Sequence, residues 1–312
     1  GNGELPFHFE VDLPLVMAEA LNNLPIPHVR VLVNNRKVVQ GVCESLGVTD
    51  VEAALRGLDK IDKIGADDVA AALVETVGVT RAQAEAALRL AAVTAAEPDA
   101  VRGAVLTALD GAEPSGLLLA GLDELEALLR AAARRRPGAV VADLKIARGL
   151  DYYTGTVYES FMTGHEDLGS VCSGGRYDSL ASNGKRTFPG LGISVGLSRL
   201  LSRVMGAGLI EVTRAVPTAV LVAVTDEEHR AVSDAVADVL RERGIAADVA
   251  PTAAKFGKQI RFADRRGIPY VWFSTEDGEQ VKDIRSGEQT AADPETWSPP
   301  PLDLLPRVSE VQ

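Results

Sequence analysis

A long run of alanine, leucine and acidic residues, from position 51 to 136, constrains the fold of this chain most strongly. Its apolar residues recur at helical spacing, as in Val69, Leu73 and Val77, and therefore line one face of a helix. The run ends in the sequence RRRPG, where arginines favour the negative end of the helix dipole and proline and glycine stop the helix. We therefore predict a helical insertion over residues 46–137.

Strand-like segments lie on both sides of this insertion. Residues 28–33 (HVRVLV) carry valine at every second position, which predicts a strand, and residues 38–43 predict a helix after it. Over residues 140–205, β-branched and aromatic residues and glycines predict several strands that lead into a final helix. Residues 1–45 and 138–212 are therefore expected to form one core around the insertion.

A third region, residues 216–292, alternates strand-like and helix-like segments. The apolar runs AVLVAV and YVWF enclose two helical patterns and the short segment ADVA. This β-α-β-α-β order is typical of a small α/β domain. The proline-rich segment that follows, residues 293–312, predicts an extended tail.

Composition limits the class of protein. The 312 residues are 46% hydrophobic, which suffices for about two or three domains. Acidic residues interrupt even the most apolar segment, residues 104–129, so we expect no membrane helix. The amino end shows no secretory leader, and we expect a cytoplasmic protein. The formal net charge of -12 argues against bulk attraction to nucleic acid and confines any RNA contact to local basic patches.

Cysteine and histidine usage excludes several chemistries. Cys43 and Cys172 lie far apart and match no metal-binding or redox spacing, so both are expected to be reduced structural thiols. The four histidines share no motif spacing, and neither a G-x-S-x-G nor an H-E-x-x-H pattern occurs. The sequence therefore predicts no protein-bound metal and no serine hydrolase chemistry.

The segment RGLDYY carries residue types suited to a polar, anionic ligand. Arg148 supplies a planar guanidinium that pairs with carboxylate or phosphate, and Tyr152 and Tyr153 add two phenols. On residue types alone, a turn salt bridge from Arg148 to Asp151 beside two core tyrosines explains the segment equally well.

Two further segments are rich in glycine. In SGGRYD, Gly174 and Gly175 let the main chain approach a ligand and Tyr177 adds a hydroxyl, although glycine pairs most often serve hairpins. In GLGISVGLSR, glycines surround an apolar strand and precede Arg199 at the start of a helix. Such a backbone suits a flat adenine ring, with the arginine cation lying over the ring or on the phosphates of the nucleotide. Close packing of a helix on a strand is the alternative explanation.

Together these segments resemble the histidyl-tRNA synthetase family. ARGLDYYTGTVYE and VCSGGRYDSL are similar to its two histidine-specific signatures, and GLGISVGLSRL resembles class II motif 3. VRVLVNNRKVVQGV, GKQIRFADRRGIPYVWF and VKDIRSGEQ match further segments in the family's order, so the resemblance covers nearly the whole chain.

The resemblance implies an α+β and α/β multidomain fold. Part of the antiparallel-sheet catalytic core of a class II synthetase would carry the helical insertion, and residues 216–292 would form a C-terminal α/β anticodon-binding domain. By the family's order, residues 1–4 follow motif 2. We therefore expect motifs 1 and 2, and with them part of the site, to have no counterpart in this sequence.

The resemblance also assigns ligands and roles. It implies histidine, ATP with Mg²⁺ and tRNA(His) as ligands, a homodimer in the complete enzyme, and catalysis by positioning and electrostatic stabilisation. Arg148 and Arg199 are the implied catalytic residues. The implied histidine-binding residues are Arg148, Tyr152, Tyr153, Gly174, Gly175 and Tyr177, and the implied ATP-binding residues are Arg148, Gly192, Gly196 and Arg199.

The expected anticodon-binding domain contains a local basic cluster although the chain is acidic. Its members on one predicted helix are Lys255, Lys258, Arg261, Arg265 and Arg266, and Lys282 and Arg285 follow in a strand and turn. Their spacing allows several of them to share a helix face toward phosphate. We predict that this helix contacts tRNA, and a solvated basic helix is the alternative.

Two functions compete at this point. The first is histidine–tRNA ligase. The second is a non-catalytic regulator on the same fold that senses histidine or uncharged tRNA. The histidine-sensing subunits lack the insertion and the α/β domain and often depart from the arginine-bearing signatures, whereas this sequence retains all of them, which favours the ligase.

Overall fold

The computed structural model describes residues 1–58, 60–146, 149, 152–275 and 278–311. The chain divides into two compact units, Gly1–Leu209 and Ile210–Gln312. Within the described residues, no helix is both long enough and apolar enough to cross a membrane.

The first unit is built on a six-stranded sheet in the order β2-β3-β1-β4-β5-β6. Strands β1 and β3 run parallel, and the other neighbouring strands run antiparallel. The strands are β1 (Val29–Asn35), β2 (Thr94–Ala95), β3 (Val140–Asp143), β4 (Thr156–Met162), β5 (Cys172–Tyr177) and β6 (Gly190–Val195). The predicted strand of alternating valines is confirmed as β1, which runs through the middle of the sheet with Val31 and Val33 fully buried.

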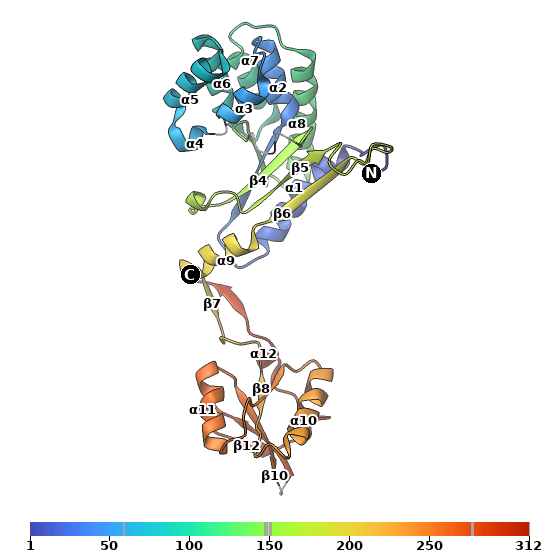
Figure 1. The fold of residues 1–312 in the computed structure, drawn as a ribbon, viewed down its shortest axis with the longest axis vertical. Helices are drawn as coiled ribbons and strands as arrows, with labels where there is room; N and C mark the ends of the chain where they lie inside the picture. The colour runs from blue at the N-terminus through green and yellow to red at the C-terminus, as the bar shows by residue number, and fades with distance from the viewer. Residues whose placement is uncertain (59, 147–148, 150–151, 276–277, 312) are drawn as a thin grey trace. The chain divides into compact units, whose positions relative to one another are not determined.

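Most helices of the first unit gather in a block at one end of this sheet (Figure 1). The helices are α1 (His8–Asn22), α2 (Arg36–Ser45), α3 (Val51–Leu58), α4 (Ile61–Ile64), α5 (Ala66–Ala72), α6 (Arg81–Ala91), α7 (Pro98–Ala108), α8 (Gly116–Arg135) and α9 (Leu197–Gly206), with a short π-helix η1 (Leu73–Val77) and a 3-10 helix η2 (Glu166–Leu168). Helices α3, α5 and α6 enclose an apolar cluster that includes Cys43 and Leu73. The predicted run of helices is confirmed.

Helix α8 joins this helical group to the sheet. Ser115 caps its first turn, because its side chain accepts a hydrogen bond from the Leu118 backbone. The helix crosses α2 at very short range: a Cβ placed on Gly41 would lie 2.3 Å from the Leu118 backbone nitrogen. The insertion predicted over residues 46–137 falls within the first compact unit. It also contributes β2, which pairs with β3, because an extended segment beside a free sheet edge completes backbone hydrogen bonds.

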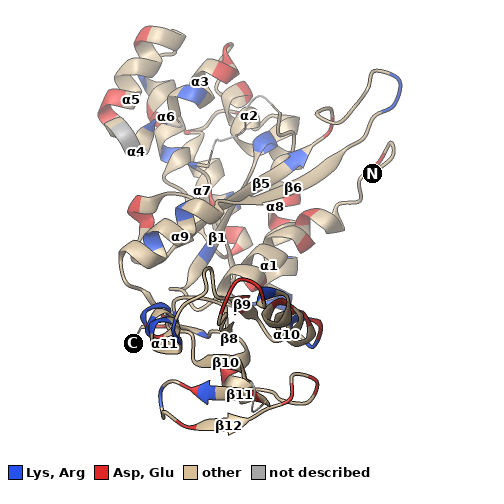
Figure 2. Cartoon of the chain, turned by 60° about the horizontal axis from the view of Figure 1, so that its bottom comes forward, with Lys and Arg blue, Asp and Glu red and all other residues tan. Residues whose placement is uncertain are grey.

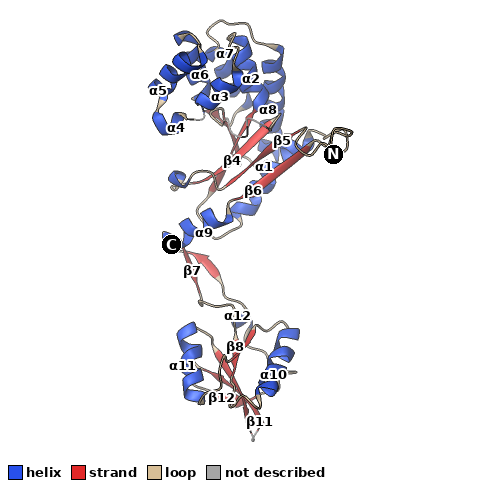
Figure 3. Ribbon diagram, in the orientation of Figure 1, coloured by secondary structure: helices blue, strands red, loops and turns tan. Residues whose placement is uncertain are grey.

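The second unit is a small α/β domain, as predicted. Its sheet has the order β12-β11-β10-β8-β9, in which β9, β8 and β10 run parallel and β11 and β12 add an antiparallel edge. Figure 3 shows α10 and α11 flanking this sheet, and separate apolar clusters pack each helix against one face. The elements are β7 (Ile210–Val212), β8 (Val220–Val222), α10 (Arg230–Glu242), β9 (Ala247–Val249), α11 (Phe256–Arg266), β10 (Tyr270–Thr275), β11 (Gly278–Asp283), β12 (Gln289–Ala291), α12 (Pro301–Leu304) and β13 (Val308–Glu310).

The tail differs from the extended segment predicted over residues 293–312. Trp297 packs edge-on against Tyr270 and Trp272, with ring centroids 5.4 and 5.6 Å away. Farther along, α12 forms a helical turn, and β13 pairs with β7. Residues 210–212, predicted to end the core, therefore pair with the tail instead. Prolines end helices and strands without preventing the apolar side chains between them from entering a core.

Candidate active site

The two glycine-rich segments singled out in the sequence lie on adjacent strands. Strand β5 carries SGGRYD and pairs with β4 on one side and with β6, which carries GLGISV, on the other. Gly175 lies opposite Gly192, and Tyr177 lies opposite Gly190. The antiparallel register therefore places the predicted glycines and Tyr177 together on one stretch of sheet.

Part of the first segment lies outside the described residues, including Arg148 and Asp151. The neighbouring Gly149 is described and has a φ of +70°, a conformation that favours glycine. A Cβ at this position would also lie 2.0 Å from the Tyr153 ring, so a larger residue would displace that ring. The ring of Tyr152 lies beside that of Tyr153, with centroids 4.3 Å apart.

Tyr153 and Tyr177 cover glycines on one face of β5 and β6. The Tyr153 ring covers Gly175, where a Cβ would lie 2.9 Å from a ring carbon, and the Tyr177 ring covers Gly190 in the same way at 2.6 Å. Burial, then a hydrogen bond with Tyr152 and the proximity of Tyr177, raise the pKa of the Tyr153 phenol. Phenols that stay protonated act as hydrogen-bond donors and acceptors. This face can therefore bind a polar ring or an amino group through neutral hydroxyls.

Arg199 lies toward the other end of β5. Its Nη1 donates a 2.8 Å hydrogen bond to the Ser170 carbonyl, and it lines a surface hollow of about 590 Å³ formed by residues 170–173 and 194–199. Gly196 is the residue that precedes α9 in this hollow. Since a strand rises about 3.3 Å per residue, Cys172 and Tyr177 at the two ends of β5 are roughly 17 Å apart. The site thus has a phenolic end and a cationic end, which suits an elongated ligand with two chemically different parts.

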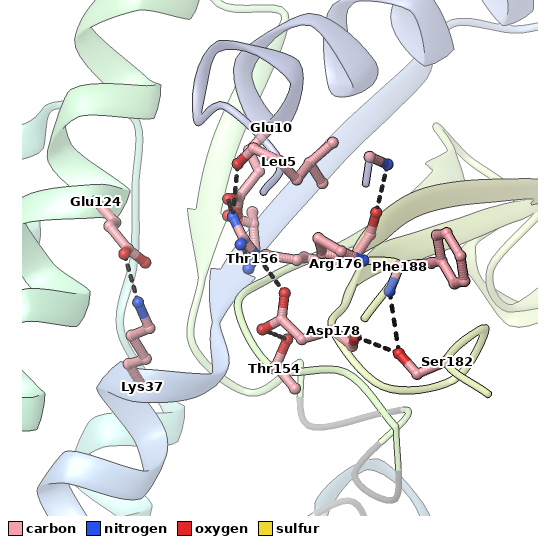
Figure 4. A network of polar contacts seen from close by, with 12 residues as sticks. Leu5, Glu10, Lys37, Glu124, Thr154, Thr156, Arg176, Asp178, Ser182 and Phe188 are labelled. Atoms are coloured by element: carbon pink, nitrogen blue, oxygen red, sulfur yellow. Dashed lines mark hydrogen bonds and ion pairs between the residues drawn. The ribbon is translucent and has the colours of Figure 1, made fainter. Parts of the chain in front are cut away.

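A buried ion pair behind the tyrosines was not predicted from the sequence. Glu10 of α1 is 1% exposed, and its Oε1 accepts a 2.7 Å bond from Arg176 Nη1 (Figure 4). The second carboxylate oxygen of Glu10 accepts bonds from the Thr156 backbone and hydroxyl, at 3.2 and 2.5 Å. Arg176 lies within the SGGRYD motif, so the sequence contained a signal that could have identified it as a functional residue. Glu10 carries no sequence signal, because one acidic residue in an amphipathic helix is ordinarily solvated.

The basic helix of the second unit is confirmed as α11, and Figure 2 shows its Lys and Arg positions. Lys258, Arg261 and Arg265 on this helix and Lys255 directly before it are exposed, and none of them forms an ion pair with a carboxylate of the described residues. Arg285, expected to add to this basic surface, is engaged elsewhere. Its guanidinium binds Asp283 and Asp303 and donates to the Tyr270 hydroxyl, each at 2.8 Å, so its charge is balanced inside the domain.

The two cysteines are buried free thiols, as predicted. Burial raises the pKa of both Cys43 and Cys172 to about 11, which keeps them protonated at neutral pH. Among the described residues, no group of three or more His, Cys, Asp or Glu side chains is arranged to hold a metal ion.

The mainly antiparallel sheet with its helical block and the separate α/β unit define a synthetase-type chain with an anticodon-binding module. The profile of the family described as histidyl-tRNA synthetase matches residues 7–200, and the profile described as anticodon binding domain matches residues 218–295. The chain belongs to the histidyl-tRNA synthetase family.

Individual relatives agree with this assignment. A histidine–tRNA ligase of Bifidobacterium longum subsp. infantis is 52% identical over 96% of this chain and 68% of its own length. One from Micrococcus luteus is 50% identical over 100% of this chain and 68% of its own length. The crystal structure of histidyl-tRNA synthetase from Nostoc sp. PCC 7120 superimposes with a TM-score of 0.75 and 31% identity, covering 93% of this chain and 69% of that one.

Proposed function

We propose that this chain is the greater part of a histidine–tRNA ligase. In the first step a carboxylate oxygen of histidine attacks the α-phosphorus of ATP, the bond to the β-phosphate breaks, and pyrophosphate leaves. In the second step a ribose hydroxyl at the end of tRNA attacks the adenylate carbonyl, loses its proton, and AMP leaves. The observation that carries the proposal is the antiparallel register of β5 and β6, which unites both glycine-rich motifs and Tyr177.

The two ends of the site suit the two parts of the adenylate. Tyr152, Tyr153 and Tyr177 offer hydroxyls to the imidazole and amino group of histidine. Arg199 lines its hollow together with Gly196 and offers a cation to the nucleotide. Gly192, also proposed to contact ATP, lies opposite Gly175 and beside the Tyr177 ring. Arg148, outside the described residues, is proposed to contact the α-phosphate, where a fixed positive charge stabilises the charge that develops during the displacement.

The second unit is proposed to bind the anticodon region of tRNA(His). Its support is the match to an anticodon-binding domain and the unpaired basic side chains on α11. We further propose that Mg²⁺ enters with ATP, that the complete enzyme is a homodimer, and that it works in the cytoplasm. These three assignments rest on kinship with the family.

The regulatory alternative is not supported by the comparisons. Relatives about 50% identical over nearly the whole chain are histidine–tRNA ligases, and the anticodon-binding domain is retained. The test is histidine-dependent exchange of labelled pyrophosphate into ATP by the full-length protein, followed by charging of tRNA(His). If the protein binds histidine but catalyses no pyrophosphate exchange, the ligase assignment is overturned and the sensor function is favoured.

A further inference from the structure

The ion pair between Glu10 and Arg176 lies behind the tyrosines at the histidine end of the site. Glu10 belongs to α1 and Arg176 to β5, and the two carboxylate oxygens of Glu10 are shared between Arg176 and Thr156 (Figure 4). The Tyr158 hydroxyl donates a 2.8 Å bond to the Glu10 carbonyl, which holds the helix at this place. The pair therefore ties α1 to two neighbouring strands, β4 and β5.

Arg176 also anchors the segment that leads from the two tyrosines into β4. Its carbonyl accepts a 2.9 Å bond from the Thr154 backbone. Its Nε donates to Asp178 at 3.1 Å, and Asp178 in turn accepts a 2.7 Å bond from the Thr154 hydroxyl. At Gly155 a Cβ would lie 2.9 Å from Arg176 Cδ, so the segment rests directly on the arginine side chain. These contacts hold Thr154 in place, and the position of the neighbouring Tyr153 is thereby fixed.

Arg176 lies on the opposite face of the strand from the tyrosines. Side chains alternate along a strand, so Gly175 and Tyr177 share one face and Arg176 points to the other. The contacts agree with this alternation, because Tyr153 covers Gly175 whereas Arg176 meets Glu10 of α1. Arg176 therefore acts on a ligand at the phenolic face through its neighbours rather than by contact.

We propose that Arg176, held by Glu10, is a positioning residue that sets Tyr153 and Tyr177 for histidine recognition. The inference rests on the proposed function, since it names a determinant of the same site. Removing the guanidinium releases Glu10 and Asp178, and with Asp178 the Thr154 hydroxyl, while the ligand-facing tyrosines stay in the chain. The nucleotide end at Arg199, on the far end of β5, keeps its own contacts with residue 170.

The experiment separates positioning from stability. In the full-length protein, Arg176→Met keeps the aliphatic stem and removes the charge, and Arg176→Lys restores the charge without the planar fork. Arg176→Met should raise the KM for histidine in pyrophosphate exchange by roughly tenfold to 100-fold, a range typical of small misplacements of binding groups. The KM for ATP should change less than about twofold, and Arg176→Lys should recover only part of the loss.

A second pair provides the matched control. Arg102 and Glu126 form a comparable ion pair between α7 and α8, at 2.6 Å with Glu126 8% exposed, away from β5. Arg102→Met should leave the histidine KM unchanged. Glu10→Gln should act in the same direction as Arg176→Met, and the double variant should be little worse than either, because the two side chains work as one unit.

Hydrogen exchange gives a readout that does not depend on activity. Backbone amides of residues 153–156 should exchange faster in Arg176→Met than in the wild type at temperatures where both are folded. The reason is that Glu10, which accepts from the Thr156 amide, and Asp178, which accepts from the Thr154 hydroxyl, both lose the guanidinium that holds them. Equal changes in the KM for histidine and ATP, an equal effect of Arg102→Met, or unchanged exchange at residues 153–156 would each overturn the positioning role. If the wild-type protein catalyses no pyrophosphate exchange, that result counts against the proposed function. The hydrogen-exchange result would still decide the role of Arg176.

Discussion

Replacing Trp297 by alanine should destabilise the second unit strongly, although this residue lies in a proline-rich tail. Its ring meets Tyr270 and Trp272 edge-on at 5.4 and 5.6 Å and belongs to the apolar cluster beneath α10. The chain also pins the tail through Arg243, whose Nη1 donates to the Trp297 carbonyl at 2.7 Å. A tail that contributed nothing to the core would not be held in this way.

The expected magnitude follows from the burial of the ring. Trp→Ala in a core costs about 3–5 kcal/mol, and Trp297 is partly rather than fully buried, so about 3 kcal/mol of unfolding free energy is the appropriate estimate. In a domain of this size each kcal/mol lowers the melting temperature by roughly 4–8 °C, which gives a decrease of roughly 12–24 °C. Trp297→Phe, which keeps an aromatic edge, should lose less than half of this.

Tryptophan fluorescence makes the measurement specific. The chain has 2 tryptophans, Trp272 and Trp297, and both lie in the second unit, so Trp272 reports the unfolding of that unit in the variant. The transition of the first unit, followed by tyrosine fluorescence or circular dichroism, should stay within about 2 °C, because the ring contacts that the substitution removes lie within the second unit. A Trp297→Ala melting temperature within a few degrees of the wild type would refute the claim that the tail belongs to the core.

Four further predictions concern the site, the RNA-binding surface and a buried thiol. Arg148→Ala in the full-length protein should slow histidine-dependent pyrophosphate exchange by roughly 100-fold or more, and wild-type exchange would remove Arg148 from the reaction. Tyr153→Phe should raise the KM for histidine and leave that for ATP nearly unchanged, whereas equal effects would place this tyrosine outside the histidine pocket. Reversing Lys258 and Arg261 to Glu should weaken tRNA binding and make it less salt-dependent while exchange stays intact, and unchanged affinity at two salt concentrations would exclude this surface. Cys43, whose pKa burial raises to about 11, should resist iodoacetamide at pH 8 and react only as the pH approaches that value, so rapid labelling of the folded protein would contradict its burial.

Local sequence determined most of the secondary structure and the identity of the motifs. The valine alternation of β1, the helical spacing around Leu73 and the order of segments in the second unit were all confirmed. These patterns are readable because a helix or strand that is buried on one face repeats its apolar residues at its own period. The glycine and tyrosine motifs were likewise recognisable as short continuous segments.

Tertiary structure decided which of these residues meet and which charges are available. Glu10 and Arg176 are 166 positions apart, so their pairing depends on how α1 packs on the sheet and leaves no local pattern. Arg285 was expected to face RNA, yet Asp303 of the tail neutralises it. Trp297 enters a core despite its proline-rich surroundings. Each case joins groups distant in the chain, and the free energy of such contacts exists only once the intervening elements have packed.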